Sequence, residues 1–200
     1  MAWAKVETQT LGSTGDDITT PTFTEKKFVN FFSHMWGSGN VNLRLRLNGS
    51  SSATVYGDRF SVNGGADSTI APNGDGWINA EVNLTNNDYD KFIVGFIMDV
   101  ASEEKLLMFW NCDRNASGAA NAPNRLEGVS KFVPSPTARV TSITIRNGNT
   151  GDYAIGSNVS VLGSELTPAS AKTIETGSIY IDTDTNQRYF WNGSSWSLQA

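Results

Sequence analysis

Apolar and polar residues alternate along much of the chain, which is the pattern of β-strands with one buried face. Residues 41–47 place valine or leucine at every odd position and asparagine or arginine at every even one. The same two-residue period occurs in residues 77–84 and 141–146. It continues over 153–161, where Gly156-Ser157 interrupts the strand and we expect a β-bulge. These segments are predicted to be antiparallel strands with one solvated face.

Two segments are apolar at odd and even positions alike, residues 92–98 and 106–110. Such strands are typical of sheet centres covered on both faces, either by loops of the same chain or by a neighbouring subunit. We interpret the coverage as a subunit interface. The residues expected to carry assembly there are Phe92, Phe96, Phe109 and Trp110.

Turn residues separate the predicted strands at the spacing of a β-sandwich, because Asn and Gly tolerate the positive φ of tight hairpins. The turns are Asn48-Gly49, Asn63-Gly64-Gly65, Asn73-Gly74-Asp75-Gly76, Asn86-Asn87-Asp88, Asn147-Gly148-Asn149 and Asn192-Gly193. The best helical stretch, residues 102–108, is interpreted as a polar turn that enters a strand. The chain is therefore predicted to be all-β.

The predicted organisation is an antiparallel β-sandwich over residues 1–163, followed by a linker and a short β-hairpin tail over 164–200. Residues 162–173 are poor in large apolar side chains, which favours a linker. The tail behind it is too short to bury a core of its own. We expect it to dock on another surface through Tyr180, Trp191 and Trp196.

Composition and charge narrow the range of partners. Only 18% of the 200 residues are charged, so Asn, Ser, Thr and the 19 glycines must form most of the polar surface. The 15 Lys and Arg are outnumbered by 20 Asp and Glu, for a net charge of −5. Nucleic-acid binding needs clustered basic residues, so we exclude it as the main activity.

One cysteine and one histidine exclude an internal disulfide and a Cys- or His-based metal cluster. Cys112 is interpreted as a small buried apolar residue and His34 as a structural histidine. No cofactor is expected. The first residues lack a signal-peptide pattern, and the apolar runs are shorter than the roughly 20 residues of a membrane helix. We therefore expect synthesis in a cytoplasm and no membrane contact.

Residues 182–186 have the spacing of a calcium loop, with Asp182, Asp184 and Asn186 at alternate positions. No glutamate follows at the twelfth position, and a hairpin turn whose Asx side chains bond their own backbone is the favoured interpretation of the motif. A cation site stays an open alternative here.

Catalytic patterns are weak. Glu81, Glu103, Glu104 and Glu127 offer carboxylates for glycoside hydrolysis, but surface glutamates are ordinary. No G-x-S-x-G elbow, phosphate loop or dinucleotide fingerprint occurs. The protein is predicted not to be an enzyme.

Among the aromatic residues, Trp77 is placed by the alternation on a polar face. A Trp there can stack on the C–H face of a sugar, although a core or interface role is the commoner fate of Trp. Trp77 is therefore the predicted contact if the protein binds a glycan.

Three segments resemble virion proteins of tailed bacteriophages. Residues 3–19 with 23–28 look like the first strands of phage surface jelly rolls, and residues 143–163 look like their closing strands. Residues 177–196, GSIYIDTDTNQRYFWNGSSW, are similar to a small module at the end of many phage structural proteins.

The resemblance implies a jelly-roll-like sandwich and a non-enzymatic building block located in the virion. It would be displayed as a head-decoration or knob protein, or as a tail or fibre component. Its implied partners are copies of itself, as a homotrimer, and other capsid or tail proteins. The rival hypothesis is a carbohydrate-binding adhesin that contacts a host-surface glycan through Trp77.

Overall fold

The computed structural model describes residues 3–70, 76–80, 90–114, 117–134, 138–165, 176–182 and 185–199. Within these ranges the regular structure is all strand and every paired strand is antiparallel. The all-β prediction is therefore confirmed. No helix of the described ranges is long and apolar enough to cross a membrane.

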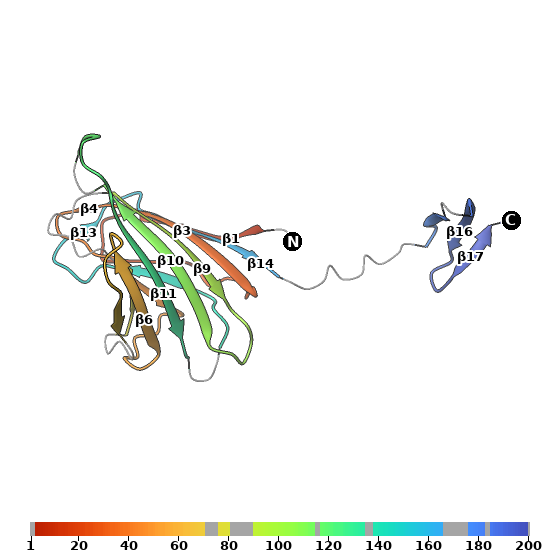
Figure 1. Cartoon of the computed structure of the whole chain (residues 1–200), viewed down its shortest axis with the longest axis horizontal. Coiled ribbons are helices and arrows are strands. Elements are labelled where there is room, and N and C mark those ends of the chain that lie inside the picture. The colour runs from red at the N-terminus through yellow and green to blue at the C-terminus, as the bar shows by residue number, and fades with distance from the viewer. Residues whose placement is uncertain are drawn as a thin grey trace. The chain divides into compact units, whose positions relative to one another are not determined.

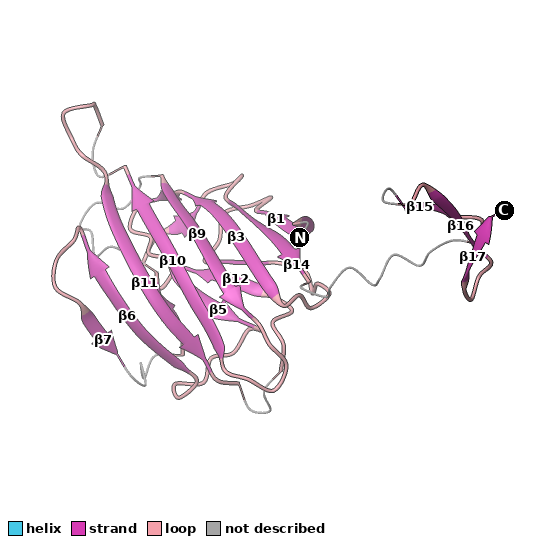
Figure 2. Cartoon of the chain, turned by 45° about the vertical axis from the view of Figure 1, so that its right-hand side comes forward, coloured by secondary structure: helices cyan, strands magenta, loops and turns pink. Residues whose placement is uncertain are grey.

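The largest element is an eight-stranded sheet, shown in Figures 1 and 2. Its strands, in spatial order, are β1 (Ala4–Thr10), β14 (Asn158–Ser164), β3 (Phe28–Met35), β9 (Lys91–Met98), β10 (Lys105–Asp113), β11 (Asn124–Phe132), β6 (Tyr56–Val62) and β7 (Ser68–Ile70). Strands from both ends of this part of the chain are therefore neighbours, and four central strands are eight or nine residues long.

A four-stranded sheet lies behind the larger one in Figure 2. Its order is β2 (Asp17–Thr19), β12 (Ile143–Arg146), β5 (Arg44–Leu47) and β8 (Ile78–Asn79), and β13 (Asp152–Tyr153) pairs separately with β4 (Gly37–Ser38). The inward side chains of the two large sheets form one core, which is what defines a β-sandwich.

The alternation assigned the core correctly where strands are half-solvated, except at Ile155, which is 60% exposed in the turn before β14. Val41, Leu43, Leu45 and Leu47 are fully buried, as are Ile143 and Ile145 on the neighbouring strand β12. Asn42 differs from the prediction of an outward polar position. It is buried because its side-chain oxygen accepts the N–H of Gly148, which fastens the loop after β12.

Two predicted turns have the expected backbone. Asn48 and Gly49 both have positive φ, and the N–H of Ser50 donates to the carbonyl of Leu47. Asn63 and Gly64 repeat this geometry between β6 and β7, so both pairs form type I′ turns. The predicted bulge at Gly156-Ser157 is wrong: Gly156 has φ 90° in a turn between β13 and β14, which belong to different sheets.

Contacts within the chain fall into two groups, residues 1–165 and 166–200. The second group contains a three-stranded sheet of β15 (Ile179–Asp182), β16 (Gln187–Trp191) and β17 (Trp196–Gln199). The described tail thus consists of three strands, the third of which begins at Trp196.

Candidate assembly surface

Strands β9 and β10 of the eight-stranded sheet bury one face and expose the other. Ile93, Ile97, Leu107 and Phe109 point into the core. The residues between them point outward, and each is apolar over most of the strand length. The described chain therefore covers these strands on one side only, and coverage of the other side by a neighbouring subunit stays a prediction.

The outward residues form rows across four strands. Phe28, Met98 and Leu106 lie opposite one another on β3, β9 and β10. The next row places Phe96 beside Met108, and Val129 of β11 follows in register. Further rows are formed by Phe32, Val94 and Trp110, and by Phe92 and Cys112. We call this set of residues, together with Trp3, the outer apolar face.

Eight side chains of this face remain 37–51% exposed, namely Trp3, Phe92, Phe96, Met98, Leu106, Met108, Trp110 and Val129. A groove of about 610 Å³ follows the face, and its apolar lining includes Trp3, Phe28, Phe96 and Met98. Soluble proteins rarely expose a continuous apolar surface of this size unless it contacts another molecule.

Sequence reasoning named only part of this face. Phe92, Phe96 and Trp110, which the sequence predicts to carry assembly, lie on it, and their role in assembly stays a prediction. Met98, Leu106, Met108 and Val129 were not singled out. The odd and even positions within 92–98 and 106–110 could have been assigned to the two faces of each strand from the sequence. Only the strand register shows that the outward side chains of neighbouring strands join into one surface.

Phe109 does not belong to the outer apolar face and is a correction to the predicted assembly set. Only 1% of its surface is exposed, because its ring lies over Gly128 on the core side of β11. A Cβ on Gly128 would stand 2.4 Å from that ring. Phe109 is thus a core residue.

Cys112 is a second correction, since it is exposed and not buried as predicted. Its position after Trp110 puts it on the outward side of β10, opposite Phe92. Desolvation by neighbouring groups and, secondarily, the charge of Asp113 raise the pKa of the Cys112 thiol.

Charged residues lie at the rim of the face, on and beside β11. Arg125 pairs with Glu127 at 3.4 Å, and Lys131 pairs with Glu104 at 2.9 Å. Both pairs are about half exposed. An apolar centre with a polar rim is the usual composition of a protein interface.

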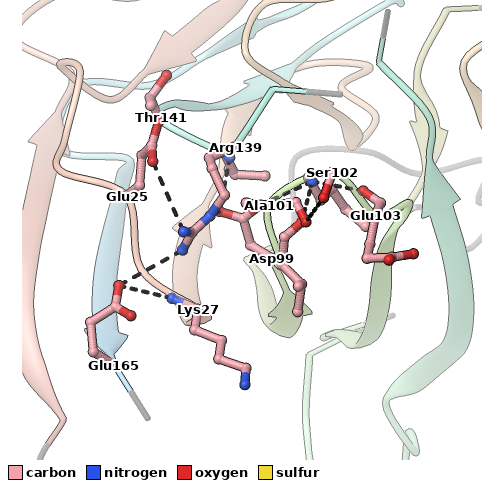
Figure 3. Close-up of polar contacts among 12 residues, drawn as sticks. Glu25, Lys27, Asp99, Ala101, Ser102, Glu103, Arg139, Thr141 and Glu165 are labelled. Carbon is pink, nitrogen blue, oxygen red and sulfur yellow. Dashed lines mark hydrogen bonds and ion pairs between the residues drawn. The ribbon is translucent and has the colours of Figure 1, made fainter. Parts of the chain in front are cut away.

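A buried ionic cluster fixes the loop that joins β9 to β10. Figure 3 shows its residues Asp99, Arg139 and Glu165. Asp99 and Lys105 are both fully buried, with 3.6 Å between the Lys105 ammonium and the Asp99 carboxylate. Lys105 donates to the carbonyls of Val100 and Glu103, at 2.6 and 2.7 Å. Asp99 also accepts from Nε of Arg139 at 3.0 Å. The hairpin loop is therefore fixed by charge and by backbone bonds together.

The same cluster holds the end of the sandwich. In Figure 3 the Arg139 guanidinium lies between Asp99 on one side and Glu25 and Glu165 on the other. The Glu165 carboxylate is 3.7 Å from Arg139 and accepts the backbone N–H of Lys27 at 3.1 Å. Glu165, the residue after β14, is thus bonded to the sandwich.

Trp77 lies on the outward side of the four-stranded sheet and is half-buried. The guanidinium of Arg44 lies over its indole ring, 4.1 Å from the centroid. The indole N–H donates to the side chain of Asn79 at 3.2 Å. The predicted glycan contact therefore already stacks on an arginine of its own chain.

The small tail sheet carries aromatic residues on one face. Trp191 and Trp196 are a register pair with ring centroids 5.4 Å apart, and Tyr180 is 6.1 Å from Trp196. Tyr189 completes the cluster, 6.0 Å from Tyr180. Tyr180 is 53% and Trp196 38% exposed, so the other residues of the tail unit do not cover this face.

The calcium-like motif lies partly outside the described residues, because Asp184 does. The Asp182 carboxylate accepts the N–H of Thr185 at 3.3 Å, and Asn186 has φ 54°. Both features are those of an Asx turn. No group of three Asp, Glu, His or Cys side chains in the described ranges is arranged to hold a metal ion.

Three other polar residues named from the sequence, His34, Glu104 and Glu127, contact neighbouring side chains. His34 lies 3.6 Å from Asp90 and packs against Trp36, with ring centroids 4.8 Å apart. Glu104 and Glu127 form the two rim pairs described above. Glu81 lies outside the described residues.

No family model, no curated protein and no solved structure matches this chain.

Proposed function

We propose that this protein is a non-enzymatic structural subunit that assembles with copies of itself through the outer apolar face. The observation that carries the proposal is the row structure of that face, which continues over β3, β9, β10 and β11 without a charged side chain at its centre. Isolated apolar residues on a surface need no explanation, but a continuous sheet face does.

The size of the face suits a second copy of the chain. With ordinary side-chain areas of about 150–250 Å², the exposed fractions of its eight residues leave on the order of 700 Å² of apolar surface. A stable interface takes roughly 800 Å² from each partner. Two pairs of charges at the rim form within the chain, and Arg59 of β6 lies opposite Val129 at the edge of the groove.

We further propose that the assembly is part of a tailed-phage virion, as a head-decoration, knob, tail or fibre component. This location is supported by the resemblance of three segments to phage structural proteins, including the tail module of 177–196. A jelly-roll-like strand path and a homotrimer belong to the same proposal. Immunogold labelling of purified particles with an antibody to this chain tests the location, and unlabelled particles would refute it.

The assembly itself is tested with two lysine substitutions, Met108→Lys and Val129→Lys. Both side chains are about half exposed, so the fold tolerates the charge while an interface does not. Light scattering coupled to size exclusion should give an oligomer mass for the natural chain and a monomer mass for the double variant. A matched control is Ile155→Lys, which charges an apolar residue that is 60% exposed in the turn before β14. A natural chain that is monomeric at all concentrations, or a control that dissociates equally, would refute assembly through this face.

The rival proposal, a glycan-binding adhesin, has less support in its original form. A sugar stacked on Trp77 would compete with the Arg44 guanidinium that already lies over the ring. The surroundings of Trp77 favour a different ligand chemistry.

A further inference from the structure

The outward side of the four-stranded sheet is basic, although the whole chain has a net charge of −5. Arg44 and Arg46 point outward from β5, since Leu45 and Leu47 between and beside them are buried. Arg146 of β12 lies directly opposite Arg44. Within the described ranges, only Arg146 of these three has a carboxylate nearby, that of Asp17 at 3.3 Å.

Two of the guanidinium groups are held in place by their surroundings. Arg44 lies over Trp77 and against the loop after β12, where a Cβ on Gly148 would stand 1.8 Å from its terminal nitrogen. Arg46 donates from Nε to the carbonyl of Gly76 at 3.0 Å. A guanidinium that stacks on a ring or is fixed through Nε keeps in-plane N–H groups for another acceptor.

We infer that this face binds an acidic saccharide chain through its carboxylate groups, with Arg44 and Arg46 as the primary contacts. Arg44 and Arg46 are two residues apart on one strand, so their cations repeat at roughly 7 Å. Like charges that face each other on an antiparallel pair repel, and a bound anion would relieve the repulsion between Arg44 and Arg146. Arginine forks match carboxylates in geometry and in charge.

The same face also carries uncharged polar groups that suit a sugar. The exposed hydroxyl of Thr19 is held by that of the buried Thr144 at 2.9 Å, and the amide of Asn79 follows across β5. A nucleic acid is the less favoured polyanion, because its dense phosphates would meet a chain of net negative charge. In this arrangement Trp77 positions Arg44 and does not itself stack on the ligand.

The test is calorimetric titration of the full-length protein with a galacturonate oligosaccharide of four to six rings as the probe. The natural chain should bind the probe, and the affinity should fall several-fold when salt rises from about 50 mM to about 300 mM. Arg44→Gln and Arg46→Gln should each weaken binding about tenfold or more. Trp77→Ala should weaken it less, by loosening Arg44. Arg188→Gln in β16 is the matched control, since it makes the same charge change in the tail unit and should leave the affinity unchanged.

Any of the following outcomes would overturn the inference. One is binding of the uronate probe that the Arg44→Gln and Arg46→Gln variants retain in full, or no binding at all. Another is equal affinity for a neutral galactose oligosaccharide, which would restore stacking on Trp77. The last is equal or tighter binding of citrate or of a single-stranded oligonucleotide, which would assign the face to small anions or to nucleic acid. Light scattering on the same variants keeps this result separate from the assembly proposal, because neither arginine lies on the outer apolar face.

Discussion

Substitutions of single residues on the core side of the sheets are expected to lower the free energy of unfolding most. Tyr56 is an example, since it is 2% exposed and stacks on Phe132 with ring centroids 5.1 Å apart. Its phenol oxygen accepts the N–H of Leu47 and its O–H donates to the carbonyl of Ser50, both at 3.1 Å. One hydroxyl therefore fastens the type I′ turn after β5 to strand β6.

This environment predicts a loss of stability at high pH. Desolvation raises the pKa of Tyr56 to about 12 from an ordinary value near 10. Because the folded state holds the phenol proton more tightly than the unfolded state, the stabilisation is complete below about pH 10 and is lost as pH rises toward about 12. The free energy of unfolding in urea should drop by about 2 kcal/mol between pH 9.5 and pH 11.5. Tyr56→Phe should flatten that dependence, and an equally steep drop in this variant would assign the effect to other groups.

Phe96 and Phe109 give a matched pair that separates the core from the assembly face. Phe109→Ala should cost about 3–5 kcal/mol of unfolding free energy, because the ring is buried and leaves a cavity. Phe96→Ala should cost clearly less in the monomer, since the side chain is 41% exposed, but it should weaken self-association. Urea unfolding and sedimentation velocity measure the two effects. Reversed results would place the interface elsewhere.

At the scale of the strands, the sequence predicts some buried faces but not the pairing of distant strands. The two-residue period located the buried side of β5 and β12, because each strand has one apolar and one polar face. In β9 both faces are apolar, and periodicity cannot say which face the chain covers itself. Gly156 shows a related limit. Its turn is coded locally, but the transfer of the chain to another sheet depends on pairings with β4 and β3 that are distant in sequence.

The polar sites were predicted least well, for the same reason. Asp99, Lys105 and Arg139 look like ordinary surface charges in the sequence, yet the fold buries two of them and brings the third from 34 residues beyond Lys105. Arg44 was placed on an outward face, but its contact with Trp77 depends on the register of β5 against β8. Contacts of this kind follow from tertiary packing and leave no local signal.

The buried ionic cluster predicts a strong asymmetry between two carboxylates of one hairpin. Asp99→Ala removes the partner of a fully buried Lys105 and should cost about 3–5 kcal/mol. Glu104→Ala breaks a pair that is half exposed on both sides and should change stability by less than about 1 kcal/mol. Thermal and urea unfolding of the two variants provide the measurement. A small effect of Asp99→Ala would mean that water compensates Lys105.

At the scale of the whole molecule, the two groups of contacts divide after Glu165, and that residue belongs to the sandwich by its bonds. The first unit buries a complete core of its own, whereas the tail sheet exposes Ile179, Tyr180 and Leu198 by half or more. The sandwich should therefore fold without the tail, but the tail should need a surface to cover it.

This division predicts different results for two truncations that differ by two residues. A chain ending at Glu165 should unfold cooperatively with the stability of the full-length sandwich. A chain ending at residue 163 loses Ser164 of β14 and the Glu165 carboxylate, so it should be less stable by about 1 kcal/mol. The chain ending at Glu165 should also keep the oligomeric mass of the natural chain, because the outer apolar face is intact. If it becomes a monomer instead, the aromatic tail and not the sheet face drives self-association.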